Sequence, residues 1–488
     1  MAESYVRRMG LIWMSVIGAI MVPHPPVLIP EIGRGEEKKV QKTIDCYRKA
    51  ARFAAQLRPD TIILSTPHSI MYRDYFHISP GSGAQGNFGR YGAGSVRFSV
   101  RYDAEFVRAL CELADRRHFP AGTLGERDAS LDQGTMVPLY FLREELPDVP
   151  IVRIGLSGLP LSDHYRLGEM IQQTAETLRR RVLYVASGDL SHRMTPSGPY
   201  GFDPDGPVYD RRVMDVMGSA RFGDLLDFSS ALLDRAAECG HRSFVMMAGA
   251  LDGLSVRAEA LSHEGTLGVG YGICTYAVTG KDASRHFLDE WEKQQAEALR
   301  KERESADLYV RLAAASIRRF VTERKRLTRK EAEEMIRENP NASESQREEL
   351  LHGKAGAFVS IREEGELRGC IGTTGPTKPC LAEEILENAV SAAVRDPRFP
   401  EIRPEELPVL SISVDVLGRP EPIASADSLD VKRYGVIVSK GGRRGLLLPD
   451  LEGVDTPAQQ IQIALQKAGL DPDETDYSLE RFEVVRHH

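Results

Sequence analysis

The feature that most limits how this chain can fold is the alternation of strand-like and helical segments in its first part. A helical pattern over residues 36–57 follows an apolar run, and the next segment, DTIILSTPHS (60–69), is β-branched and short enough for a buried strand. Strand, helix and strand in this order are typical of a right-handed βαβ unit with parallel strands. Candidate strands at 150–158 and 182–192, around a helix at 165–181, extend the pattern. We therefore predict an α/β fold with a mixed or parallel sheet flanked by helices.

Three of the predicted strands lead into a histidine. The segments are IMVPH, ILSTPH and YVASGDLSH, which end at His24, His68 and His192. In open α/β sheets, ligands bind outside the carboxyl ends of the strands, so the three imidazoles can converge at one edge. Neutral imidazole binds iron, zinc or copper, and the prolines beside His24 and His68 stiffen the strand ends. One such histidine could simply cap a strand, but three in equivalent positions favour a shared metal or catalytic site.

A metal held by two imidazoles needs a further ligand, and the sequence offers several. A carboxylate would complete a facial triad with open positions for substrate and oxygen. Glu238 and Cys239 come just before an apolar helical segment, and His263 and Glu264 lie on a predicted strand. The residues alone leave these candidates open.

Length, charge and cysteine content limit the class of protein. A chain of 488 residues is expected to form two or three domains, and a net charge of −8 gives no basic surface for nucleic acid. Six scattered cysteines without a C-x-x-C pair argue against a structural zinc site or a disulfide framework, so we expect a cytoplasmic protein.

The N-terminal apolar run has a second interpretation. Arg7 and Arg8 precede MGLIWMSVIGAIMV (9–22), as in a signal peptide, but no small-residue cleavage site follows. We expect the second half of this run to be the first strand, and the run is short for a membrane span.

The rest of the chain suggests a loop, a linker and a second domain. Residues 81–94 hold six glycines without a GK[ST] sequence, so we predict a mobile loop over a site rather than a phosphate cradle. The first domain is expected over 14–280, and a charged, solvated linker helix over 281–305. A smaller α+β domain follows over 306–485, opening with an amphipathic helix at 308–324.

The motifs of the first domain are similar to those of a known family. GAIMVPHPPVL, STPH, SGDLSH and ECGHRSFVMMAGAL, in this order, resemble the class III extradiol ring-cleavage dioxygenases (LigB type) and the related Memo proteins. The resemblance covers roughly residues 15–280. It implies a non-haem Fe(II) site, with zinc or copper as less favoured metals.

The resemblance also implies roles for individual residues. His24 and His68 would be the imidazole ligands and His192 the acid–base residue, while a small aromatic diol and O2 would react at the metal. The third ligand would fall at Glu238, as in the dioxygenases, or at Cys239, as in Memo-like proteins. We favour Glu238, because oxygen-activating iron suits a hard ligand and a thiolate would be exposed to oxidation.

One motif departs from the dioxygenase pattern. Those enzymes carry Asp-His-Gly before a VPL stretch, whereas this chain reads LDQGTMVPL, with Gln133 in place of the histidine. Gln133 can donate a hydrogen bond but cannot shuttle a proton, so cleavage of an ordinary catechol is less expected. Asp132 is expected to orient the site, and both residues join His192 as candidate catalytic residues.

The C-terminal part resembles the AMMECR family. The matching motifs are LRGCIGT (367–373), ENAVSAAVRDPRFPEIRPEEL (387–407) and SISVDVL (411–417). Cys370 could be a thiolate activated by Arg368 or, as we favour, a small buried residue. Arg395, Asp396 and Arg398 could line an anion pocket or form structural ion pairs.

Two other functions stay open beside the dioxygenase. One is a Memo-like metal- or ligand-binding module without ring cleavage, and the other is a different metal-dependent redox reaction. We expect no nucleic-acid or membrane partner, and a homo-oligomer is compatible with the sequence.

Overall fold

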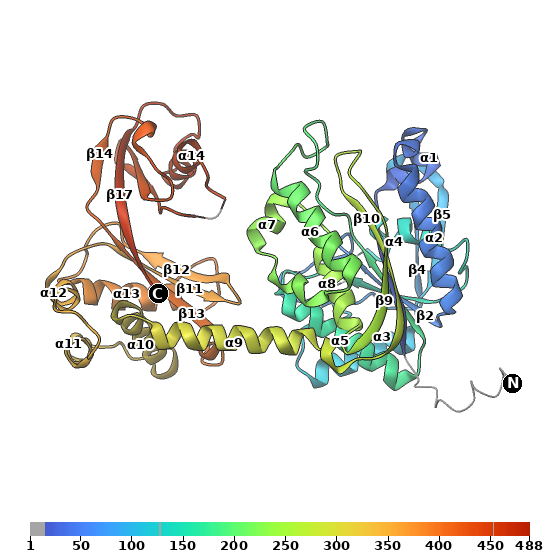
Figure 1. Cartoon of the computed structure of the whole chain (residues 1–488), viewed down its shortest axis with the longest axis horizontal. Helices are drawn as coiled ribbons and strands as arrows, with labels where there is room; N and C mark the ends of the chain where they lie inside the picture. The colour runs from blue at the N-terminus through green and yellow to red at the C-terminus, as the bar shows by residue number, and fades with distance from the viewer. Residues whose placement is uncertain (1–14, 126–127, 452) are drawn as a thin grey trace. The chain divides into compact units, whose positions relative to one another are not determined.

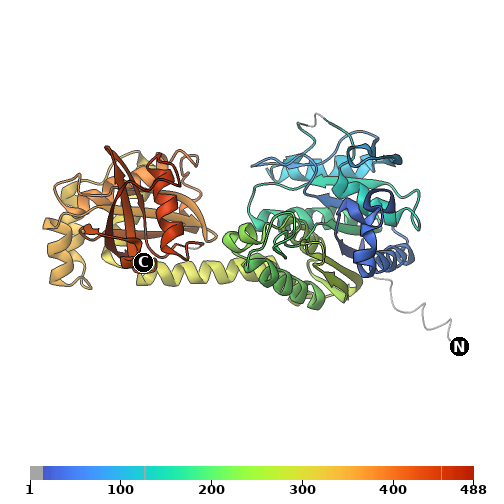
Figure 2. The same cartoon turned by 90° about the horizontal axis from the view of Figure 1, so that it is seen from above.

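The computed structural model of the chain describes residues 15–125, 128–451 and 453–488. It divides into two compact units, the first extending to Trp291 and the second from Glu292 to His488. The boundary falls inside α9 (Phe287–Ser305), the yellow helix in Figure 2. Arg7 and Arg8, together with the first half of the N-terminal apolar run, lie outside the described residues.

The first unit is built on a six-stranded mixed sheet with the order β7-β2-β8-β1-β10-β9. The first four strands of this order are parallel, and β10 and β9 are antiparallel to their neighbours. This confirms the predicted α/β class and the mixed sheet. The strands are β1 (Val16–Val22), β2 (Thr61–Thr66), β7 (Ile151–Gly155), β8 (Val182–Ser187), β9 (Leu254–Glu264) and β10 (Tyr271–Lys281).

The central strands are apolar throughout because helices cover both faces of the sheet. Every residue of β1, β2 and β8 is buried, as expected for parallel strands with two covered faces. Figure 1 shows α2 and α4 on one side of the strands and α6 and α8 on the other. The helices of this unit are α1 (Pro30–Gly33), α2 (Gln41–Leu57), α3 (Ala104–Arg116), α4 (Gln133–Leu142), α5 (Leu161–Leu178), α6 (Asp205–Ser219), α7 (Ser230–Ala236) and α8 (His241–Ala250).

Glycine lets two of these helices touch through their backbones. A Cβ atom on Gly168 of α5 would lie 2.1 Å from the carbonyl oxygen of Met246 in α8. One on Gly249 of α8 would lie 2.0 Å from the carbonyl oxygen of Tyr165. Larger residues would push α8 outward, and α8 begins directly after the candidate ligands Glu238 and Cys239.

The glycine-rich segment 81–94 is not the mobile loop that we predicted. It forms most of an antiparallel hairpin of β4 (Gly83–Phe88) and β5 (Ala93–Arg101). Ala84, Phe88, Ala93 and Phe98 are buried in a core that also contains residues of α2 and α4. Alternate residues of the hairpin therefore bury apolar side chains. A second small sheet pairs β3 (Phe76–His77) with β6 (Ala121–Gly122).

The start of α9 is packed rather than solvated, in contrast to the predicted linker. Leu288 and Trp291 belong to the core of the first unit, and Nε1 of Trp291 donates a hydrogen bond to Asp227 at 3.0 Å. The remainder of α9 is largely exposed, as its charge pattern predicted.

The second unit has a sheet with the order β12-β11-β13-β17-β15-β16, and β14 pairs with β17. Helices α10 and α13 pack on the β11–β13 part, and α14 packs on β15 and β16. The helices are α10 (Leu308–Glu323), α11 (Arg329–Glu338), α12 (Glu344–His352), α13 (Leu381–Val394) and α14 (Pro457–Lys467). The strands are β11 (Ala357–Glu363), β12 (Glu366–Gly372), β13 (Leu410–Leu417), β14 (Glu421–Ile423), β15 (Tyr434–Lys440), β16 (Arg443–Leu447) and β17 (Ser478–His487).

Among the described helices, none combines the length and the apolar character that a membrane crossing requires.

Candidate metal centre

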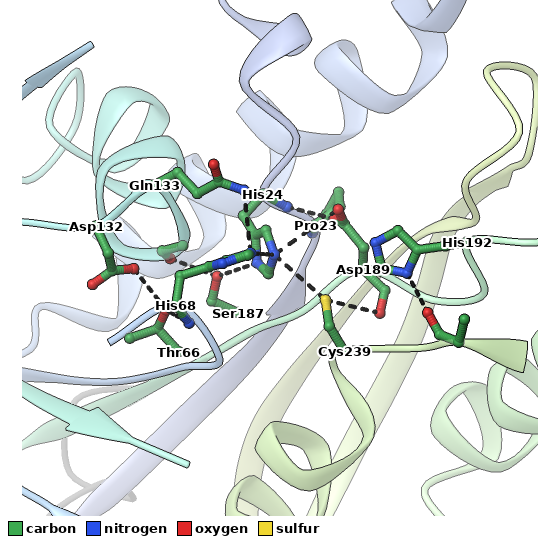
Figure 3. A network of polar contacts seen from close by, with 12 residues as sticks. Pro23, His24, Thr66, His68, Asp132, Gln133, Ser187, Asp189, His192 and Cys239 are labelled. Carbon is green, nitrogen blue, oxygen red and sulfur yellow. Dashed lines mark hydrogen bonds and ion pairs between the residues drawn. The ribbon is translucent and has the colours of Figure 1, made fainter. Parts of the chain in front are cut away.

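The three histidines follow three neighbouring parallel strands. Strands β2, β8 and β1 lie side by side, and His68, His192 and His24 come shortly after their carboxyl ends. Figure 3 shows these side chains gathered at one edge of the sheet, with Cys239 between them.

His24 and His68 face each other directly. Their Nε2 atoms are 3.0 Å apart, and their rings lie edge to face with centroids 4.7 Å apart. His24 is completely buried, whereas His68 is exposed toward a cavity. Burial and the neighbouring His68 lower the pKa of His24 well below its usual value. The ring of His68 is partly desolvated and its pKa is lowered too, so both imidazoles are neutral near pH 7.

The tautomer of His24 follows from Ser187, at the end of β8. The hydroxyl of Ser187 donates its only proton to the carbonyl oxygen of Gly134 at 2.6 Å. It must therefore accept a hydrogen bond from Nδ1 of His24, 3.0 Å away. Nε2 of His24 is then the unprotonated nitrogen, the form that binds metals.

Neighbouring segments hold the turn that carries His24. The phenol of Tyr47 in α2 donates to the carbonyl oxygen of Pro23 at 2.9 Å. The backbone amide of His24 donates to Oδ1 of Asp189 at 2.8 Å. The proline-flanked segment after β1 is thus held by one contact from α2 and one from the segment that follows β8.

Cys239 is the third residue brought to this point. Its Sγ atom lies 3.5 Å from Nε2 of His24, and one ligand atom from each of His24, His68 and Cys239 lies within 4.8 Å of the others. A close approach of two glycines places it there: a Cβ on Gly188 would meet the Cα of Gly240 at 2.1 Å. The amide of Gly240 also donates to the carbonyl oxygen of Asp189 at 3.1 Å.

Glu238, which we favoured from the sequence, is directed elsewhere. Its carboxylate accepts a hydrogen bond from the amide of His241 at 2.6 Å, at the start of α8. Burial raises the pKa of Glu238 to about 7. The other acidic candidate, Glu264, accepts hydrogen bonds from Thr43. The geometry therefore favours Cys239 over both carboxylates, because adjacent residues in the tight turn before α8 point in different directions.

His192 lies on the other side of Cys239 from His68 (Figure 3). Its Nδ1 atom is 2.5 Å from the carbonyl oxygen of Ala237, so Nδ1 carries the proton and Nε2 is free to accept one. Tyr200, an exposed residue, packs edge-on against this ring with centroids 5.1 Å apart.

Asp189 is a site residue that our sequence reasoning missed. It forms a second compact group with His192 and Cys239, in which the three ligand atoms again lie within 4.8 Å of one another. Burial raises its pKa to about 6. The signal was its position in SGDLSH, where an acidic residue follows the glycine at a buried strand end.

Asp132 and Gln133 support His68 from the start of α4. Asp132 caps the helix by accepting from the amide of Thr135 at 3.0 Å, and it accepts from Oγ1 of Thr66 at 2.8 Å. Oγ1 of Thr66 in turn accepts from the amide of His68 at 3.1 Å. The side-chain nitrogen of Gln133 lies 3.1 Å from Nε2 of His68. Asp132 thus orients the loop of His68, and Gln133 contacts its ring.

A cavity of about 720 Å³ opens beside His68. The hairpin β4–β5 and the start of α4 contribute to its walls, which include Gln85, Asn87 and Gln133. Its size is within the usual range for small-molecule sites. The segment 81–94 therefore does border the candidate site, although as a hairpin.

The singled-out residues of the second unit form ordinary ion pairs. Arg368 pairs with Glu406 at 2.7 Å, and Asp396 pairs with Arg398 at 2.6 Å, which lowers the pKa of Asp396 to about 2. Asp396 also accepts from the amide of Cys370 at 2.9 Å. Asp396 therefore satisfies one backbone amide of the edge strand β12, and Arg368 is engaged with Glu406.

Comparison with known proteins gives a family match for each of the two units. The profile of the catalytic LigB subunit of aromatic ring-opening dioxygenases matches residues 18–274, just over half of the chain. The chain belongs to the LigB family. The AMMECR1 profile matches residues 310–487 of this LigB-family protein, so both resemblances found in the sequence are confirmed.

Relatives of this LigB-family chain show the same two-domain composition or one part of it. A protein of Clostridium acetobutylicum is 38% identical over 481 residues, which is 97% of this chain and 99% of the relative. A Thermotoga maritima protein is 54% identical over 145 residues, 30% of this chain and 83% of the relative. A solved structure from Pyrococcus horikoshii is 32% identical, with a TM-score of 0.32, and the match covers 38% of this chain and 90% of that one.

Proposed function

We propose that the first unit is a metal-dependent oxidoreductase that opens a small aromatic diol with O2, using one ion bound by His24, His68 and Cys239. The observation that most directly supports this proposal is the convergence of these three donor atoms at the carboxyl edge of the sheet. Fe(II) is the metal we expect first, with zinc and copper as alternatives.

The donor set fits a metal ion on the evidence of its own hydrogen bonds. The lone pair of His24 Nε2 faces Nε2 of His68 and the thiol of Cys239. Protons on those two groups can satisfy it in the metal-free protein, and a cation takes their place when it binds. A redox-active ion at this point would supply electron transfer between the diol and O2.

The surrounding residues can perform the remaining steps. The cavity beside His68 holds the aromatic ring, and the side-chain nitrogen of Gln133, 3.1 Å from Nε2 of His68, is placed to donate a hydrogen bond to the diol. His192, with Nδ1 fixed by Ala237, presents Nε2 as a base for a diol proton and later as an acid. Asp189 stabilises the turn of His24 and the charge that develops on His192.

Oxygen uptake by the metal-loaded full chain tests this proposal. We expect consumption of O2 with a catechol panel and a coloured ring-opened product. His192→Gln should keep the metal and lose about 100-fold or more in turnover, because the imidazole base is removed. No uptake by fully iron-loaded protein across the panel would contradict the enzyme proposal.

A second candidate function is a metal-binding redox module without ring cleavage. Cys239 favours it, because a thiolate suits softer ions such as Cu(I) or Zn(II). Gln133 favours it as well, because an amide cannot shuttle protons. Tight Cu(I) binding without oxygen uptake would support this candidate over the first.

A further inference from the structure

The cavity beside His68 carries an excess of arginine. Its charged lining residues among those described are Arg90, Arg97, Arg153, Asp128 and Asp132. His68, one of the candidate metal ligands, lines this cavity, and the hairpin β4–β5 supplies the first two arginines.

Arg153 has a structural role. It is buried, its Nε donates to Oγ of Ser79 at 2.7 Å, and its Nη1 donates to the carbonyl oxygen of Ser130 at 2.8 Å. It also lies 3.6 Å from Oδ2 of Asp132. Its charge is therefore matched inside the wall of the cavity.

Arg90 and Arg97 are less closely paired than Arg153, although hydrogen bonds from Ser130 together with the nearby charge of Arg90 lower the pKa of Asp128. Within residues 15–125, 128–451 and 453–488, neither forms an ion pair. Nε of Arg97 donates to the carbonyl oxygen of Gly94 at 3.1 Å, which orients the side chain and leaves both Nη atoms available. Asp128, the remaining acidic lining residue, accepts from the amide of Ser130 at 2.9 Å.

Both arginines come from the tip region of the hairpin, whose backbone is closely packed, and both line the same cavity. Oδ1 of Asn87 accepts from the amide of Gly89 at 2.8 Å, just before Arg90. A Cβ on Gly94, whose carbonyl orients Arg97, would lie 3.6 Å from the Cα of Gly89. The strand register also pairs Asn87 with Arg97.

We propose that Arg90 and Arg97 form an anion subsite, so that the substrate of this cavity carries a carboxylate or phosphate group away from its reacting end. Guanidinium groups bind such anions through forked, charge-assisted hydrogen bonds. The inference rests on the proposed function for the reacting end, which would lie at His68 and the metal. By binding the anionic group, Arg90 and Arg97 then determine which aromatic compounds are held with their reacting end at the metal centre.

Binding of simple probes to the metal-free full chain tests the subsite independently of the metal. Calorimetry would compare benzoate and phenyl phosphate with benzamide, their neutral counterpart, at low ionic strength. We expect at least one anion to bind about tenfold more tightly than benzamide and to weaken as salt is raised. The better of the two identifies the anionic group.

Substitutions locate the binding. Arg90→Gln and Arg97→Gln should each weaken anion binding about fivefold or more and leave benzamide unchanged. Arg257→Gln is the matched control, because Arg257 is an exposed arginine on β9 that does not line the cavity. Equal binding of benzamide and both anions, undetectable anion binding, or unchanged binding by both cavity variants would overturn the proposal.

A second pair of ligands separates this inference from the proposed function. Catechol and 3,4-dihydroxybenzoate would be titrated anaerobically into zinc-loaded protein. If neither diol binds through the metal while benzoate binding still depends on Arg90 and Arg97, the proposed function fails and the subsite stands. If both diols bind with equal affinity in wild type and arginine variants, the subsite fails and the diol proposal stands.

Discussion

In this protein the hydroxyl of Ser187 lies 3.0 Å from Nδ1 of His24, and it donates its own proton to the carbonyl oxygen of Gly134. This pair of contacts leaves Nε2 of His24 unprotonated and directed at His68 and Cys239. The candidate metal centre is therefore organised before any ion binds.

Ser187→Ala should weaken metal binding about 10- to 100-fold, because the tautomer and orientation of His24 lose their support. The measurement is competition for the metal with a chelator of known affinity. Ser65→Ala is the control, since Ser65 is a buried serine of the adjacent strand that bonds to Ser243 instead. Equal metal affinity in Ser187→Ala and wild type would contradict the role of Ser187.

Metal affinity should rise with pH. Burial, helped by the charges of Asp189 and Glu238, raises the pKa of Cys239 well above its usual value, so an incoming ion must displace the thiol proton. Because the histidines are neutral near pH 7, we expect release of one proton per ion and up to about a tenfold gain in affinity per pH unit between pH 6 and 8. Proton release measured by calorimetry in two buffers would show this. Wild-type metal affinity that stays constant between pH 6 and 8 would contradict displacement of the thiol proton.

Much of the fold and of the site could be predicted from the sequence. The buried strands have continuous apolar runs, and the histidines at their ends mark the sheet edge where the structure places them. The choice between Glu238 and Cys239 could not be made, because it depends on the tertiary contact between Gly188 and Gly240.

The hairpin and the linker were misjudged for a related reason. Glycines conceal the alternation of buried and exposed positions in 81–94, since they have no side chains to show it. In α9, two buried residues among many charged ones are too few to give a periodic signal, although Leu288 and Trp291 anchor its first turns.

Glu238→Gln should make the stability of the metal-free protein less dependent on pH. The pKa of Glu238 is raised to about 7 in the folded state, so the fold favours its protonated form. This stabilisation is complete below about pH 4.5 and is lost as pH rises through 7, a change of up to about 3 kcal/mol. In thermal unfolding, the stability of the variant relative to wild type should increase from pH 5 to pH 8.

The matched control for this effect is Glu259→Gln, which changes an exposed carboxylate on β9. It should follow the wild-type pH dependence. A constant difference between Glu238→Gln and wild type at all pH values would be inconsistent with a buried, protonated Glu238.

Trp291→Ala should destabilise the first unit by about 3–5 kcal/mol, because a large buried side chain and its bond to Asp227 are removed. Differential scanning calorimetry of the full chain should show the loss in the transition that metal binding shifts upward. Lys293→Ala, at an exposed position of the same helix, should have little effect. Equal transitions in both variants would mean that α9 is not anchored in this unit.

The most direct test of the central claim is the metal content of anaerobically prepared protein after loading with Fe(II) and removal of excess metal. The account predicts about one ion per wild-type chain, retention of that ion in Glu238→Gln, and its loss in His24→Ala, His68→Ala and Cys239→Ser. Wild-type protein that keeps no metal, or full retention in Cys239→Ser together with loss in Glu238→Gln, would contradict it.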